Sequence, residues 1–123
     1  HQTSEYEGLA KAFDQIRRHD VKELNFKWLV VRGSSHNWET DFEAIAKFKK
    51  VVEGRDGLKR LRLEFIFEYI SRIPSRDVCN RALVRWKGIK KELELICART
   101  GIEVVTLICW FHHEKTGTML WKE

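Results

Sequence analysis

The chain contains a single proline, Pro74, and only seven glycines in 123 residues. So few helix- and strand-breaking residues leave little room for linkers, and the length suits one domain with a buried core. No apolar run approaches the ~20 residues of a membrane span, and no signal peptide is evident. We therefore expect residues 1–123 to form a single globular domain. Because the sequence begins at His1 rather than Met, we expect that domain to come from a longer protein.

Cysteine is also scarce, with three residues at irregular positions: Cys79, Cys97 and Cys109. An odd number without a Cys-x-x-Cys pair argues against a disulfide framework and against a zinc site. Cys109, His112 and His113 come closest to a metal-ligand cluster, but side chains alternate along a strand, so His112 points away from the other two. We expect no metal, no cofactor and an intracellular protein, cytoplasmic or nuclear.

A catalytic constellation is missing as well. Glu64 and Glu68 share one face of a predicted strand with Arg62, but no lysine completes the set that a metal-dependent nuclease would use. Ion pairing of Arg62 with these carboxylates is the better interpretation. A nucleic-acid-processing enzyme is therefore the third and least favoured hypothesis, and we predict no catalytic residues.

What the chain does contain is an uneven charge. Residues 47–91 hold 14 Lys or Arg and 5 Asp or Glu, a net charge of +9, whereas residues 1–46 and 92–123 each sum to −2. A block this basic predicts a negatively charged partner, most often nucleic acid.

Hydrophobic periodicity predicts an α+β fold: an N-terminal helix followed by β-α-β-α-β-β, giving a four-stranded mixed sheet with its helices packed mainly on one face. The expected elements are helices over 4–18, 40–53 and 76–99 and strands over 26–32, 60–70, 103–113 and 118–122. Thr40 and Glu43 have the spacing of a capping box, and Ser75 is placed to cap the long helix. The order over residues 26–122 resembles that of Alba-like chromatin proteins and of the C-terminal domain of a bacterial translation initiation factor, without any matching residue motif.

Five tryptophans are many for this length. We expect Trp28, Trp86 and Trp110 to lie in the core, since each falls within an apolar pattern. Trp38 precedes the predicted helix at Thr40, so it is either a hydrophobic staple, which we favour, or a platform on which a base stacks.

Two loops between a strand and the following helix should meet at one edge of the sheet. There, free amides, hydroxyls and arginines can hold a phosphate, although capping alone explains any one of them. The candidate residues in these loops are Arg32, Ser34, Ser35, His36, Trp38, Arg72, Ser75 and Arg76.

The remaining basic residues gather at the opposite edge and on the long helix. Phosphate contacts from such residues give salt-sensitive binding, whereas the alternative is a solvated helix face. The candidates are Lys50, Arg55, Lys59, Arg60, Arg81, Arg85, Lys87, Lys90 and Lys91.

A second, narrow apolar stripe on the long helix comprises Val84, Gly88 and Leu95. Gly88 in mid-helix suggests a close approach there, either to the N-terminal helix or across a homodimer. The leading hypothesis is thus a nucleic-acid-binding domain, with RNA ahead of DNA and no membrane. The alternative is a protein-interaction or homo-oligomerisation domain using this stripe.

Overall fold

The computed structural model describes residues 22–32, 38–54, 57–70, 74–113 and 116–123. In chain order the elements are β1 (Glu23–Arg32), α2 (Trp38–Ala46), α3 (Phe48–Glu53), β2 (Arg60–Tyr69), α4 (Arg76–Thr100), β3 (Glu103–His113) and β4 (Thr118–Lys122). The helix expected over residues 4–18 lies outside the described residues.

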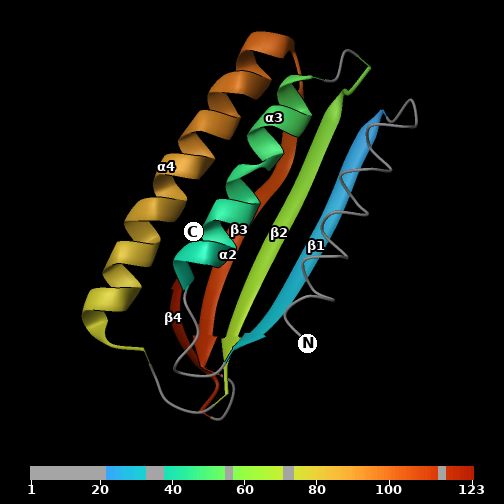
Figure 1. Ribbon diagram of the computed structural model, residues 1–123. Coiled ribbons are helices and arrows are strands. Elements are labelled where there is room, and N and C mark those ends of the chain that lie inside the picture. The colour runs from blue at the N-terminus through green and yellow to red at the C-terminus, as the bar shows by residue number, and fades with distance from the viewer. Residues whose placement is uncertain (1–21, 33–37, 55–56, 71–73, 114–115) are drawn as a thin grey trace.

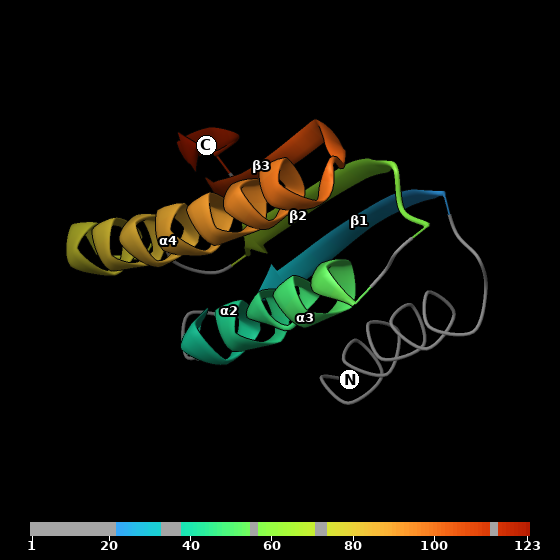
Figure 2. The same ribbon diagram turned by 90° about the horizontal axis from the view of Figure 1, so that it is seen from above.

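The four strands lie in the sheet in chain order, β1-β2-β3-β4. The first three are parallel, and β4 pairs antiparallel with β3. Figures 1 and 2 show α2, α3 and α4 on the same face of this sheet. The predicted mixed sheet, with two helical crossovers on one face, is confirmed for the described part of the chain.

Strand boundaries follow the alternation of the sequence closely. The inward residues of β2 run from Leu61 to Tyr69 and are all buried, whereas their neighbours are exposed or half-buried. β3 and β4 have the predicted bounds, and Gly117 in the turn between them has a φ of 65°. β1 begins at Glu23, three residues earlier than expected, because Leu24 continues its alternation and pairs with Leu61.

The helix over residues 40–53 departs from the expectation. α2 begins at Trp38, so Thr40 lies within the helix and the predicted capping box with Glu43 is wrong. The segment also divides at Lys47, where the Lys47 amide donates to the Ala44 carbonyl, three residues back, at 3.2 Å. A bond of this span tightens the turn and separates α2 from α3.

α4 begins and ends as predicted. Its cap is Ser75, whose Oγ accepts a hydrogen bond from the Val78 amide at 3.2 Å. It ends at Gly101, whose φ of 75° places it in the left-handed region. A residue with a Cβ is strained there, so glycine suits the end of this helix.

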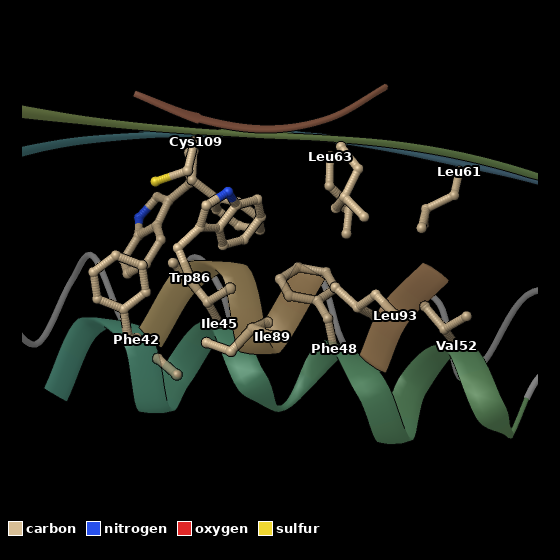
Figure 3. Close-up of a cluster of buried hydrophobic side chains, with 14 of the residues drawn as sticks. Phe42, Ile45, Phe48, Val52, Leu61, Leu63, Trp86, Ile89, Leu93 and Cys109 are labelled. Carbon is tan, nitrogen blue, oxygen red and sulfur yellow. The ribbon is translucent and has the colours of Figure 1, made fainter. Parts of the chain in front are cut away.

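The core lies between the helices and the inner face of the sheet (Figure 3). The predicted stripe of α2 and α3 (Phe42, Ile45, Phe48 and Val52) is fully buried. It meets Trp86 from α4, which is also fully buried, and the inward leucines of β2. Burial of each such side chain contributes about 1.5–3 kcal/mol, so this layer supplies most of the stability.

Two indole groups hold β4 against α4. Trp86 Nε1 donates to the Glu123 carbonyl at 2.7 Å, and Trp121 Nε1 donates to the Cys79 carbonyl at 3.0 Å. The Trp121 ring also stacks on Phe111, with 4.7 Å between the centroids. The five-residue strand β4 is therefore fixed by side chains as well as by its ladder.

Of the helices in the described residues, none is both long and apolar enough to cross a membrane.

Candidate nucleic-acid interface

The carboxyl edge of the sheet is where the two candidate loops were expected to meet. Arg32, Tyr69 and His113 end β1, β2 and β3 in register, and α2 and α4 follow the first two strands. The side chain of Arg32 and the candidates Ser34, Ser35, His36 and Arg72 lie outside the described residues, so phosphate binding at this edge stays a prediction.

Two described candidates at this edge have structural roles. The Ser75 hydroxyl is occupied in capping α4. Trp38 is half-buried and packs edge-on against Phe42, with 5.9 Å between the ring centroids. The guanidinium carbon of Arg81 lies 5.9 Å from the Trp38 centroid. Trp38 thus packs from within α2 rather than from before its cap, so the expected hydrophobic contact exists but the staple position is wrong.

Arg76 is the exposed first residue of α4. It lines a pocket of about 350 Å³ between the start of α4 and β4, together with Leu83 and Trp121. Most of the lining residues are apolar, and Arg76 is the one cationic residue among those that line the pocket in the described structure.

Two buried polar side chains near this edge were not predicted. Asp41, in the first turn of α2, is fully buried. Acidic residues are favoured in a first turn because the N-terminus of a helix carries a partial positive charge. His113 is 4% exposed, and its Nδ1 lies 2.8 Å from Thr116 Oγ. Its Nε2 is buried without a partner among the described residues. The burial of His113 could have been predicted from the alternation along β3, because His113 lies on the same inward face as Cys109 and Phe111.

The amino edge of the sheet is less cationic than its sequence suggests. Arg62 pairs with Glu23 at 2.6 Å, so the predicted pairing with Glu64 and Glu68 is wrong. The early start of β1 brings Glu23 within reach. Arg60 lies 3.5 Å from Glu103 and is therefore also paired.

Of the other candidates near this edge, Lys50 and Lys59 are exposed, and Arg55 lies outside the described residues. Among the described residues of this edge, the unpaired candidate cations are therefore lysines, and whether Arg55 joins them stays a prediction.

The middle of α4 concentrates the remaining positive charge. Residues 81–91 carry five cations and no acidic residue. Arg81 pairs with Asp77 at 3.0 Å. The other four form no ion pair with another described residue: Arg85, Lys87, Lys90 and Lys91.

The spacing of these cations costs stability. Arg81 and Arg85 are four residues apart, as are Lys87 and Lys91, so like charges are neighbours on the helix surface. Each such pair costs about 0.2–0.5 kcal/mol at low salt. Arg81 is compensated by its pair with Asp77, but no described ion pair offsets the repulsion between Lys87 and Lys91, and an anionic partner would relieve it.

Beyond residue 91 two charged residues of α4, Glu92 and Arg99, are paired with α3. Glu92 accepts a hydrogen bond from Lys49, and Arg99 lies 2.8 Å from Glu53. The hydrogen bond and charge of Lys49, with a smaller effect of Arg85, lower the pKa of Glu92. These bridges neutralise the C-terminal part of α4 and leave the 81–91 segment as its basic region.

The narrow apolar stripe of α4 faces solvent. Val84 is 71% exposed and Leu95 58% exposed. A Cβ built on Gly88 would meet no described atom within 4 Å. The two partners expected to approach Gly88, the N-terminal helix and a second copy of the chain, lie outside the described structure, so that close approach stays a prediction.

The prediction that three tryptophans lie in the core is correct for two of them. Trp28 and Trp86 are buried as expected, but Trp110 lies on the sheet face away from the helices, so its placement in the core was wrong.

Cys79, Cys97 and Cys109 are free. Burial raises the pKa of all three thiols, most strongly that of Cys109, so none is activated as a nucleophile.

No family model, curated protein or solved structure matches this chain.

Proposed function

We propose that this domain binds nucleic acid by contacting phosphates through the outer face of α4. The observation that carries the proposal is the charge of residues 81–91, where four exposed or half-exposed cations form no ion pair within the described structure and only Arg85 lies near enough to Glu92 to influence its pKa. Elsewhere in the described residues Arg60, Arg62 and Arg99 are paired, so the 81–91 segment holds the longest run of cations without ion pairs that the described structure presents.

The dimensions of α4 suit a phosphate backbone. At 1.5 Å per residue, the segment from Arg81 to Lys91 is about 15 Å long. Phosphates of one strand of a duplex recur about every 3.4 Å along the duplex axis, so several lie within reach of a segment of this length. Long lysine and arginine side chains on a convex helix form such contacts without a cleft.

Contacts of this kind fix position and carry no base information. They therefore suit RNA and DNA alike, and the preference for RNA remains a separate prediction. Trp38 and Trp86 are occupied in packing, so stacking of bases on aromatic side chains is not part of the proposed mechanism.

Salt dependence is the decisive measurement. Labelled RNA and DNA, single- and double-stranded, are titrated with the full chain at about 50 and 200 mM salt. Four phosphate contacts to a duplex give a log–log slope of about −4, and thus a roughly hundredfold loss of affinity over this range. Absence of binding at the lower salt concentration would sink the proposal, and binding insensitive to salt would refute the phosphate mechanism.

Matched variants locate the surface. Lys87→Gln with Lys91→Gln should weaken binding and reduce the salt slope by about two. Lys27→Gln with Lys59→Gln removes the same charge from exposed positions elsewhere and should change little. A larger loss from Arg72→Gln with Arg76→Gln would move the site to the carboxyl edge.

The proposed compartment is intracellular. Three free cysteines, two of them buried in the core, favour a reducing environment, where such thiols persist. A protein partner for the Val84, Gly88 and Leu95 stripe remains the rival hypothesis, in which the charge of α4 would attract an acidic protein.

A further inference from the structure

The sheet face opposite the helices is the least expected surface of the molecule. α2, α3 and α4 all cover the other face, and no described helix packs on this one (Figure 2). Parallel strands are ordinarily covered on both faces. The exposed face of β1, β2 and β3 therefore invites a second layer.

One row of this face is apolar. Leu29, Ile66 and Trp110 form a row across β1, β2 and β3 in register. Leu29 is 51% exposed, and Met119 of β4, in the next row, is 43% exposed. A contiguous apolar area of this kind on a protein surface marks an interface.

Trp110 also has an unmet hydrogen bond. Its Nε1 is buried without a partner among the described residues, and the Lys122 ammonium lies 3.9 Å from the centroid of its ring. Buried indole donors are nearly always paired, so a partner layer that brings an acceptor would satisfy this one.

Charge on this face is balanced and self-complementary. Its outward positions hold four cations and four carboxylates: Lys27, Arg60, Arg62, Lys122, Glu23, Glu64, Glu68 and Glu103. A neutral face with both signs does not attract nucleic acid. Arg60 and Arg62 already pair with Glu103 and Glu23 within the chain. The remaining Lys27, Lys122, Glu64 and Glu68 suit a second copy of the face, in which the two lysines meet the two carboxylates across a two-fold axis.

The size of the face agrees with such a dimer. Ten residues at about 3.3 Å and four strands about 4.8 Å apart give a flat footprint on the order of 600 Å². Side-chain relief raises the accessible area of that footprint toward the ~800 Å² per partner of a stable interface. The outer face of α4, in contrast, would bring Lys87 and Lys91 of two copies together, so it is a poor self-interface.

We propose that two copies of this chain pack sheet against sheet, with Leu29, Ile66, Trp110 and Met119 at the centre of the interface. Both α4 helices then lie on the outside of the dimer, facing opposite directions. The proposal goes beyond nucleic-acid binding and does not depend on it.

The test is the oligomeric state of the full chain, measured by sedimentation equilibrium over a wide range of protein concentration. The wild type should dimerise, and Leu29→Glu should weaken self-association roughly a hundredfold, because the dimer would bury its carboxylate among apolar side chains. Val84→Glu, an equally drastic change on the exposed face of α4, should leave the dimer intact.

Each alternative outcome is decisive. A wild type that is monomeric throughout overturns the proposal, as does dissociation by Val84→Glu with Leu29→Glu still dimeric. Circular dichroism checks that the variants fold. If Leu29→Glu does not fold, Met119→Glu on a different strand carries the same test. Retained nucleic-acid binding by a monomeric variant would separate this interface from the α4 surface.

Discussion

Replacing Gly88 by alanine should stabilise the protein. Glycine in the interior of an exposed helix costs about 0.5–1 kcal/mol relative to alanine, because it loses more backbone freedom on folding. Gly88 lies in the middle of α4, and an added Cβ would meet no described atom within 4 Å. No contact therefore offsets the gain, and we expect the free energy of unfolding to rise by about 0.5–1 kcal/mol.

The size of the effect is measurable by calorimetry. An unfolding entropy of about 2.1 cal/mol/K per residue gives ~260 cal/mol/K for a chain of this length. An added 0.5–1 kcal/mol then raises Tm by about 2–4 °C. Urea unfolding at 25 °C provides an independent value, and the m-value should not change.

Gly101→Ala is the matched control. A Cβ at Gly101 would also meet no described atom within 4 Å, but its φ is 75°. Left-handed backbone costs a residue with a Cβ about 1–2 kcal/mol, so the same substitution should lower Tm by about 4–8 °C. The two variants differ in backbone conformation alone.

A fall in Tm for Gly88→Ala would refute this reasoning. It would mean that another chain or segment packs closely on α4 at Gly88. The outer face of α4 would then be an interface, as in the rival hypothesis. Loss of self-association in this variant would likewise place the dimer seam on α4 and not on the sheet.

Three further outcomes follow from the core and the surface pairs. Trp86→Ala should lower the free energy of unfolding in chemical denaturation by about 3–5 kcal/mol, because it leaves a cavity in the core and removes the hydrogen bond to the Glu123 carbonyl. A decrease below ~1 kcal/mol would contradict this. Burial raises the Cys109 pKa well above 9.0, so the folded state holds this proton more tightly than the unfolded state. The resulting stability is complete below the pKa of an unfolded cysteine, about 8.5, and is progressively lost as the pH rises above it, so the protein should be less stable at about pH 10 than at about pH 8. Cys109→Ala should lack this loss in urea unfolding at the two pH values, and an equal decline in both proteins would disprove the assignment. Arg62→Gln should cost at most about 1 kcal/mol in thermal unfolding, since its pair with Glu23 is exposed, and a larger cost would show that the pair is not solvated.

Much of the fold was accessible from the sequence because its two periodicities are clean. Alternation fixed the inward side of β2 and β3, and the stripe around Trp86 fixed the buried side of α4. The helix at residue 38 was harder, because Thr40 and Glu43 match a capping box by spacing alone. Only the backbone shows that the helix has already begun at Trp38.

The candidate site was predicted as a set of residues but not as a surface. Charge counting could not show that Arg60 and Arg62 are paired across strands, because pairing depends on register. Trp110 was misplaced for a related reason: an apolar run in a parallel strand does not say which face the helices cover. Among the described residues, ion pairing removes four of the 14 cations from the basic block: Lys49, Arg60, Arg62 and Arg81. The densest run of unpaired cations that remains lies in the 81–91 segment of α4.

The order of strands in this sheet also bears on how the chain is made. Because β1, β2, β3 and β4 lie side by side in chain order, each strand adds to the edge that its predecessor has just formed. No strand has to be inserted between two that are already paired. During synthesis from the N-terminus, β1 and β2 can pair before β3 is complete. The hydrogen bonds of Trp121 and of the Glu123 carbonyl can then fix β4 against α4, after the first three strands are in place.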